Sequence, residues 1–355
     1  MEKELAKINN YALERGGLMI YPEFLKEKDT IGVTAPSDGI TDEVKLKRLD
    51  NAIKTFEEKG FNIKETPNAR CSVKGRSSTS KERASELESL YEDDNLKAII
   101  CASGGDFLLE MLSEVDLNII KDNPKWLQGN SNPTGLLFTI TTNLDIATIY
   151  ADNFGCFGME PWHKSLENNL EILKGNIIEQ TSFSKYEKSF KDYITGKEPY
   201  ELTEKVYWKN LNNEDTINIK GRIIGGCLDI IADLFGTRFD KTKDFLEKYK
   251  DDGIIWYIDI CELTGEVIAR TLWKLKDNGY FKYTKGIIFG RSFIYNSYYD
   301  ISYEETIYES LKDLNIPIII NADIGHVSPR MTIINGAIAT ITSSKGKGKI
   351  RFELK

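Results

Sequence analysis

Residues 129–134, GNSNPT, have the side-chain types and the spacing of a nucleophile on a sharp turn. An apolar run, KWLQ, precedes this segment, and a second one, TGLLFTI, begins within a few residues. The spacing predicts a strand that passes directly into a helix, with Pro133 in the first helical turn. On such a turn the Ser131 hydroxyl lies at the positive end of the helix, and the backbone N–H of Asn132 points to where an oxyanion forms.

The same segment has a second interpretation. It reads G-x-S-x-x and not the G-x-S-x-G of a standard nucleophile elbow, because Thr134 stands where the second glycine would be. A cluster of serine and asparagine side chains that caps a helix has the same spacing. The motif alone leaves both interpretations open, so the nucleophile needs partners elsewhere in the chain.

Only two histidines occur, so a mechanism that needs an imidazole must use His163 or His326. His326 follows the apolar run IPIIINADIG directly after a glycine, a position suited to a mobile general base at a domain edge. A half-buried loop histidine would fit that position as well. His163 begins the segment HKSLENN, where a role in capping or packing a helix is the better interpretation.

Asp259 ends another apolar run, GIIWYID, and is the candidate acid. A carboxylate that accepts a hydrogen bond from the far nitrogen of the base histidine fixes its tautomer and stabilises the imidazolium. The triad would then follow the chain order Ser131, Asp259, His326. An exposed acid at a strand end is the alternative, and Glu262 is then the next candidate for the orienting acid.

Residues 103–106, SGGD, form a second short turn between an apolar run and an expected helix. Gly104 and Gly105 carry no side chains, so their backbone N–H groups can approach a bound anion. The turn could supply a second oxyanion donor or hold a substrate carboxylate. A nucleotide phosphate would suit it too, but neither GxGxxG nor GxxxxGK[ST] occurs in the sequence.

These segments lie in a sequence that alternates short apolar runs with amphipathic stretches from about residue 30. The alternation predicts an α/β fold with a largely parallel sheet. We expect an N-terminal α/β domain at 1–172 that carries the nucleophile and a C-terminal α/β domain at 220–355 that carries the acid and the histidine. Residues 173–219 are polar and aromatic, which predicts an irregular connection or a small β excursion.

The composition bounds the class of protein. The chain has 355 residues, of which 41% are hydrophobic and 29% charged, so it can form two packed cores. It has no run of eighteen uncharged apolar residues, and its polar start, MEKELAKINN, lacks the apolar core of a secretory signal. We therefore expect a cytoplasmic protein without a membrane span.

Cysteine usage and charge argue against several other functions. The five cysteines are scattered, odd in number and without a CxxC pair, which argues against a disulfide framework and a structural zinc site. The net charge of −8 offers no basic stripe for nucleic acid. We expect no metal and no cofactor, and a small molecule as the ligand.

Taken in order, six segments resemble the LD-carboxypeptidase family of serine peptidases, which includes the microcin-immunity type. They span nearly the whole chain: GVTAPSDG, ASGGDFLLEML, GNSNPTGLL, GGCLDIIADLFGT, WYIDICELTGEVIARTLWKL and ADIGHVSPRMTIINGA. The resemblance implies Ser131 as nucleophile, His326 as base and Asp259 at the acid position. It also implies two α/β domains with the active site in the cleft between them, usually in a homodimer.

The resemblance implies two substrate classes. Family members release terminal D-alanine from cytoplasmic peptidoglycan tetrapeptides during recycling. The immunity-type branch cleaves the bond that joins a peptide or aminoacyl group to a nucleotide. In either case Ser131 would attack the carbonyl, and N–H groups of Asn132 and of Gly104 or Gly105 would hold the oxyanion before an acyl-enzyme is hydrolysed.

Three positions depart from the family pattern. The usual elbow reads glycine, aromatic, serine, aspartate, whereas this chain has Asn130 for the aromatic residue and Asn132 for the aspartate. The usual acid is glutamate, and Asp259 is one methylene shorter. The alternative to an active peptidase is therefore a family member that binds such ligands with little turnover.

Overall fold

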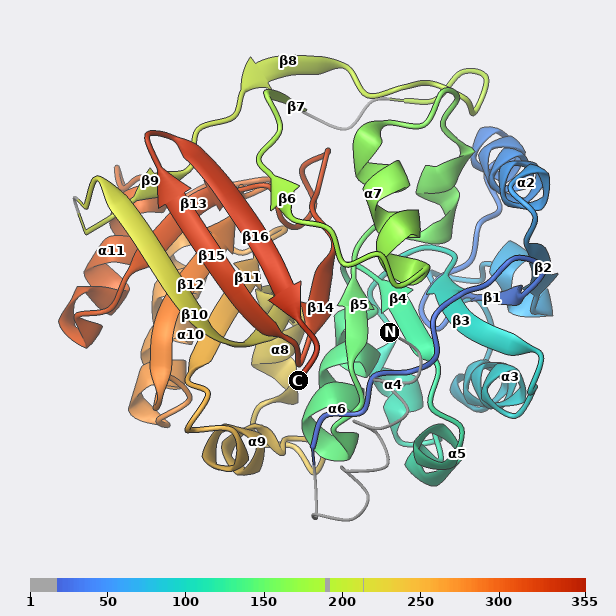
Figure 1. The fold of residues 1–355 in the computed structure, drawn as a ribbon, viewed down its shortest axis with the longest axis horizontal. Coiled ribbons are helices and arrows are strands. Elements are labelled where there is room, and N and C mark those ends of the chain that lie inside the picture. Colours follow the sequence, from blue (N-terminus) through green and yellow to red (C-terminus); the bar gives the residue numbers. More distant parts are fainter. Residues whose placement is uncertain (1–17, 189–191, 213) are drawn as a thin grey trace.

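Two β-sheets lie side by side in the computed structural model, which describes residues 18–188, 192–212 and 214–355 (Figure 1). Helices flank both sheets, so the predicted α/β class is confirmed. No helix in these described ranges is long and apolar enough to cross a membrane.

The first sheet has six strands in the order β14-β5-β4-β3-β1-β2. Its first five strands along the chain are mutually parallel, and β14 is antiparallel to β5. The strands are β1 (Thr30–Thr34), β2 (Asn62–Glu65), β3 (Leu96–Cys101), β4 (Trp126–Gly129), β5 (Thr148–Tyr150) and β14 (Ile333–Asn335). The accompanying helices are α2 (Glu43–Glu58), α3 (Ser80–Tyr91), α4 (Leu109–Leu112), α5 (Leu117–Asp122), α6 (Thr134–Leu144) and α7 (Lys164–Leu173).

The second sheet has eight strands in the order β6-β16-β15-β10-β11-β12-β13-β9, of which β10 to β13 are parallel. The strands are β6 (Gln180–Thr181), β9 (Lys209–Asn210), β10 (Thr216–Cys227), β11 (Ile254–Asp259), β12 (Thr284–Gly290), β13 (Ile318–Ala322), β15 (Ile338–Ser344) and β16 (Lys347–Glu353). The helices are α8 (Leu228–Leu234), α9 (Thr242–Lys248), α10 (Gly265–Asp277) and α11 (Tyr303–Leu311).

Strand β14 ties the C-terminal part of the chain to the first sheet. It follows β13 of the second sheet, pairs with β5 of the first, and is followed by β15 of the second. The chain therefore crosses between the sheets twice after residue 322. The domain boundaries expected at residues 172 and 219 stay a prediction. The sheets do not follow them strictly, because β14 lies beyond both residues and yet belongs to the first sheet.

Helix α6 fills the space between the two sheets (Figure 1). Nine of its eleven residues are buried, because apolar neighbours surround it on all sides. The Phe138 ring stacks on Trp256 of β11 at 6.2 Å and meets Phe235 edge-on at 6.1 Å. At the start of the helix, Thr134 Oγ1 accepts a hydrogen bond of 3.1 Å from the Cys227 N–H. The helix that follows Ser131 is thus fixed to the second sheet.

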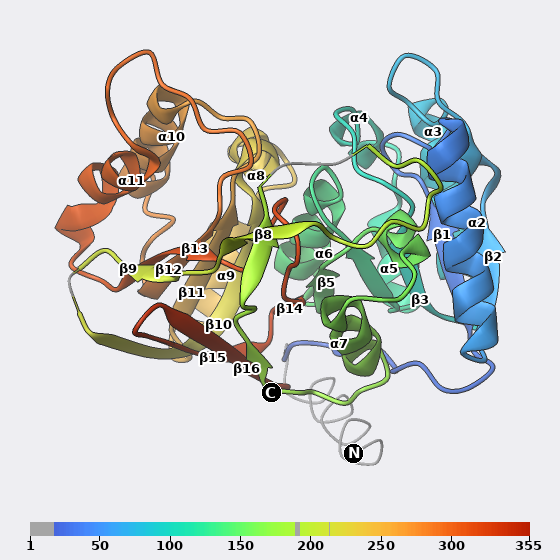
Figure 2. The ribbon, with the colours of Figure 1, turned by 90° about the horizontal axis from the view of Figure 1, so that it is seen from above.

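The connection at 173–219 holds β6, β9 and a small hairpin of β7 (Lys185–Glu187) and β8 (Leu202–Lys205). Residues 192–205, which we call the strap, run from this hairpin across the molecule toward α2 (Figure 2). Arg48 of α2 donates a 3.0 Å hydrogen bond from Nη1 to the Gly196 carbonyl, and its guanidinium lies 4.1 Å from the Tyr193 ring centroid. The strap is therefore anchored on the first half of the chain.

We expect Phe138→Ala to lower the free energy of unfolding by about 3–5 kcal/mol, because it removes a buried ring between the sheets. Urea denaturation followed by far-UV circular dichroism measures the change. The matched control is Tyr298→Ala, whose side chain is 84% exposed and should alter stability by less than about 0.5 kcal/mol. Equal effects of the two substitutions would contradict the role given to α6.

Candidate active site

Ser131 lies on the turn between β4 and α6, and the predicted strand, turn and helix are all present. Its backbone adopts a left-handed conformation with φ of +67°, which is costly for a residue with a side chain. The turn is held from both sides: the Ser131 carbonyl accepts from the Thr134 N–H at 2.9 Å, and the Asn130 N–H donates to Asn153 Oδ1 at 3.0 Å. Strained turns of this kind are typical of functional positions.

The glycine turn after β3 lies directly against Ser131. A Cβ atom added at Gly104 would lie 3.1 Å from Ser131 Cβ and 3.3 Å from Ser131 Oγ, so the backbone comes this close only because the residue is glycine. Gly105 faces elsewhere, since a Cβ there would lie 2.6 Å from Ser37 Oγ. The N–H groups of Gly104 and Asn132 donate to no described residue, which leaves both available as oxyanion donors.

The Asn132 side chain points away from the pocket and into the protein, where it is fully buried. Its Oδ1 atom accepts hydrogen bonds from Ser37 Oγ at 2.6 Å and from the Leu108 N–H at 2.8 Å. Its Nδ2 atom has no partner among the described residues. The carboxylate oxygen of an aspartate could accept the same two hydrogen bonds. The replacement of the expected aspartate by Asn132 therefore preserves these contacts.

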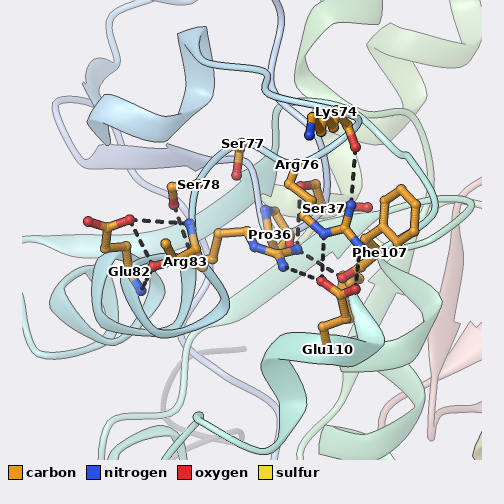
Figure 3. Close-up of polar contacts among 12 residues, drawn as sticks. Pro36, Ser37, Lys74, Arg76, Ser77, Ser78, Glu82, Arg83, Phe107 and Glu110 are labelled. Atoms are coloured by element: carbon orange, nitrogen blue, oxygen red, sulfur yellow. Dashed lines mark hydrogen bonds and ion pairs between the residues drawn. The ribbon is translucent and has the colours of Figure 1, made fainter.

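A buried arginine joins the loop after β1 to the segment that follows the Gly104 turn (Figure 3). Arg83 is fully buried, and its Nη1 donates to the carbonyls of Pro36 at 3.0 Å and Phe107 at 2.9 Å. Its Nη2 lies 3.3 Å from Glu110, which also pairs with Arg76. The two loops that flank the Gly104 turn therefore share one cation.

Asp259 and His326 come together at one edge of the second sheet, although β12 lies between the strands that precede them. Asp259 ends β11, and His326 lies in the loop after β13. His326 Nδ1 is 2.6 Å from Asp259 Oδ2, and the His326 backbone N–H donates to Oδ1 at 3.2 Å. Gly325 between them is required, because a Cβ there would lie 1.9 Å from Oδ1. The short aspartate reaches the imidazole because the backbones approach this closely.

The Asp259 carboxylate is completely buried but stays ionised. Burial by itself raises the pKa of this carboxyl, yet His326, the Tyr150 hydroxyl and Arg330 together hold the pKa below its ordinary value of 3.8. A carboxylate facing Nδ1 orients the ring and fixes its tautomer, which leaves Nε2 as the nitrogen that can act as a general base.

Ser131 and His326 line one pocket of about 310 Å³. Neither buried ring nitrogen of His326 makes a hydrogen bond in the described part of the chain: Nδ1 has only its ion-pair contact with Asp259, and Nε2 has no partner, Ser131 included. Bonds between a nucleophile and its base are often long in the absence of substrate. The structure thus brings Ser131 and His326 to one pocket, with the buried Asp259 beside the imidazole, and the catalytic roles of all three stay predictions.

Tyr150 is a site residue that the sequence did not single out. Its hydroxyl donates to Asp259 Oδ2 at 2.5 Å and accepts from the Ser131 N–H at 3.2 Å. The phenol therefore bridges the nucleophile turn of one sheet and the acid of the other. Its place at the carboxyl end of a parallel strand beside β4 was the available signal, because such strand ends converge on ligand sites.

Other candidates from the sequence lie outside this arrangement. His163 caps α7, with its ring accepting from the Ser165 N–H, so the expected capping role is confirmed. Glu262 is exposed and makes no described contact with His326.

Among the described residues one group of side chains could hold a metal, namely Cys227, Asp259 and His326, whose ligand atoms lie within 4.8 Å of one another. Both Asp259 oxygens already accept hydrogen bonds, from Tyr150 and from the His326 N–H. The cluster is therefore accounted for by the acid–histidine pair.

Comparisons with known proteins match most of the chain. Profiles of the LD-carboxypeptidase N-terminal and C-terminal domains match residues 31–151 and 220–341. The "Probable murein peptide carboxypeptidase" of Bacillus subtilis is 24% identical over 91% of this chain and 92% of its own. The microcin C7 self-immunity protein MccF of Escherichia coli is 26% identical over 86% of this chain and 88% of its own. The crystal structure of an MccF-like protein from Bacillus anthracis superposes with a TM-score of 0.78 at 26% identity, covering 94% of this chain and 99% of that one.

We expect Tyr150→Phe to slow labelling of Ser131 by a fluorophosphonate about 10- to 100-fold, because Asp259 and the Ser131 N–H both lose their shared partner. The labelling rate at several pH values measures the effect. Tyr257→Phe is the matched control: this buried neighbour packs 5.5 Å away, ring to ring, and its hydroxyl bonds to neither group. Unchanged labelling in Tyr150→Phe would show that the bridge does not position the site.

Asp259→Asn tests the charge of the acid. Because the folded pKa of Asp259 is lowered, its ionisation stabilises the protein above the unfolded pKa, and this contribution is lost as the pH falls through the folded value. We therefore expect the variant to be less stable by about 1–3 kcal/mol at pH 7. The difference should shrink as the pH drops below about 4. Urea midpoints at pH 7 and 3 measure both, and a difference independent of pH would contradict an ionised Asp259.

Proposed function

The chain belongs to the LD-carboxypeptidase family, and from this premise we propose that it is a serine peptidase with Ser131 as nucleophile. His326 would be its general base and Asp259 the acid that orients the base. The observation that carries the proposal is the pocket shared by Ser131 and His326, with the ionised Asp259 carboxylate 2.6 Å from Nδ1. Peptidase activity fits the family, and the serine mechanism fits this arrangement.

In the proposed reaction, Ser131 Oγ attacks the amide carbonyl carbon while His326 Nε2 takes the hydroxyl proton. The N–H groups of Gly104 and Asn132 donate to the oxyanion that forms. The tetrahedral intermediate collapses, His326 returns the proton to the leaving amine, and an acyl-enzyme remains. Water then attacks the ester with His326 again as base, which releases the acid and restores the Ser131 hydroxyl.

We propose that the substrate is a murein peptide, cleaved at an amide bond next to a D-amino acid. A relative that covers 91% of the chain is named for murein peptide cleavage. The pocket is large enough for the terminal residues of such a peptide, and cationic side chains lie along it: Lys45, Arg48 and Arg330. Murein peptides carry several carboxylates, so this lining favours them.

A second candidate is the bond between a peptide or aminoacyl group and a nucleotide. The observation that favours it is the likeness to the microcin C7 self-immunity protein at 26% identity. Tyr193 of the strap also lines the pocket and offers an aromatic face to a base. The departures at Asn130 and Asn132 leave room for a third possibility, a member that binds such ligands with little turnover.

The family resemblance also supports two proposals about the protein as a whole. We propose that it works as a homodimer and that it acts in the cytoplasm, where murein peptides are recycled. Sedimentation velocity of the purified chain tests the first proposal, and fractionation of the native cell tests the second.

We expect a fluorophosphonate probe to label the wild-type chain and to leave Ser131→Ala unlabelled. The same substitution should lower kcat on a murein tetrapeptide by at least about 10³-fold, because the nucleophile is lost. Mass spectrometry of the products, beside an aminoacyl-nucleotide mimic, identifies the bond that is cleaved. Ser103→Ala, another serine at this pocket, should remain labelled. Absence of labelling in the wild type with tight ligand binding would exclude a serine peptidase.

A further inference from the structure

The pocket beside Ser131 carries positive charge in a chain of net charge −8. Its lining includes three cationic side chains, Lys45, Arg48 and Arg330, and no carboxylate from the described residues. Such a lining concentrates anionic ligands and disfavours cationic ones. The three cations differ in how much hydrogen-bonding capacity they have left for a ligand.

Arg48 is committed to the protein. Its Nη1 donates to the carbonyls of Gly196 and Glu198, and its Nη2 donates to the Cys156 carbonyl. These bonds hold the strap, so Arg48 serves mainly as a support. Lys45 is the opposite case, because its exposed ammonium has no acidic partner among the described residues and lies near the solvent.

Arg330 is buried but only partly committed. Its Nη2 donates to Ser328 Oγ at 2.9 Å and to the His326 carbonyl at 3.3 Å, and its Nε faces Asp152 Oδ1 at 3.4 Å. Its Nη1 donates to no described residue and is not completely buried. The guanidinium is therefore held rigidly from one side while one nitrogen remains available to the pocket.

The position of Arg330 relative to His326 restricts which group it can contact. In the proposed reaction His326 delivers a proton to the leaving amine. In a terminal amino acid the carboxylate carbon is two bonds from that amine nitrogen. A receptor for this carboxylate must therefore lie next to the histidine, and Arg330 bonds to the carbonyl of His326 itself.

We propose that Arg330 binds the free carboxylate of the terminal residue that the enzyme releases. The inference rests on the proposed peptidase function and narrows its substrates to peptides with an uncapped C-terminus. Arg330 Nη1 donates a charge-assisted hydrogen bond to this carboxylate, and Asp152 keeps the guanidinium oriented. Arg330 is thus a specificity residue for cleavage of one terminal residue.

The test compares a murein tetrapeptide with the same peptide capped as a C-terminal amide. We expect the wild type to prefer the free acid in kcat/KM by about 10- to 100-fold, since the amide lacks the charge. In Arg330→Gln the ratio of kcat/KM for the acid to kcat/KM for the amide should fall to near one, and this ratio is read independently of the overall rate of the variant. The matched control is Arg270→Gln, an exposed arginine outside the pocket that should keep the wild-type preference.

Two outcomes overturn the proposal even if Arg330→Gln does not fold. One is a wild type that cleaves the acid and the amide equally well. The other outcome applies if the protein binds peptides without turning them over. In that case calorimetry of Ser131→Ala should show tighter binding of the free acid than of the amide. Equal binding of the two peptides, or no binding of either, refutes the role assigned to Arg330. Failure of the peptidase proposal is seen separately, as absent probe labelling. If Arg330→Gln abolishes competition by adenosine monophosphate but keeps the acid preference, Arg330 binds a phosphate instead.

Discussion

The buried Asp259 carboxylate, with two hydrogen-bond donors and one close ring contact, holds this site together. Asp259 faces the His326 ring, accepts from the backbone N–H of His326, and accepts from the Tyr150 hydroxyl. A buried charge without partners would be very costly, so the elements that carry the donors must stay in register. These elements are the ends of β11 and β5 and the loop after β13, which belong to both sheets. The Asp259 carboxylate can therefore stay ionised only while the two halves of the molecule keep their relative alignment.

Close approach is the second constraint. Gly325 lies against Asp259 at a distance that leaves no room for a Cβ atom, and Gly104 lies against Ser131 where a Cβ atom would be tightly packed. The contact at Gly325 explains how an aspartate can stand where the family resemblance implies a glutamate: the missing methylene is compensated by a backbone that comes nearer. The departure at Asn132 is also accommodated, since its oxygen accepts two hydrogen bonds inside the protein and its side chain does not face the pocket.

Two buried arginines beside the strap and in the loop after β13 make the pocket cationic. Arg48 fixes the strap over the pocket, and Arg330 is held beside His326 by Ser328 and Asp152. Both arginines are buried, and a buried cation persists only where carbonyls, carboxylates or a ligand satisfy it. Both terminal nitrogens of Arg48 donate to backbone carbonyls, whereas Arg330 keeps Nη1 for the pocket. The proposed base, His326, and the proposed carboxylate receptor, Arg330, thus lie on one loop, four residues apart.

The sequence alone determined the features that local patterns encode. Apolar runs and glycine turns predicted the α/β class and the turn at Ser131, and the chain order of Ser131, Asp259 and His326 followed from where those runs end. Only the tertiary structure decided which side chains meet across long separations. Tyr150 and Asp259 are 109 residues apart, and β14 joins a sheet whose other strands end at residue 150. No local pattern contains such contacts, because they depend on how two sheets pack around α6 and on which strand ends converge there.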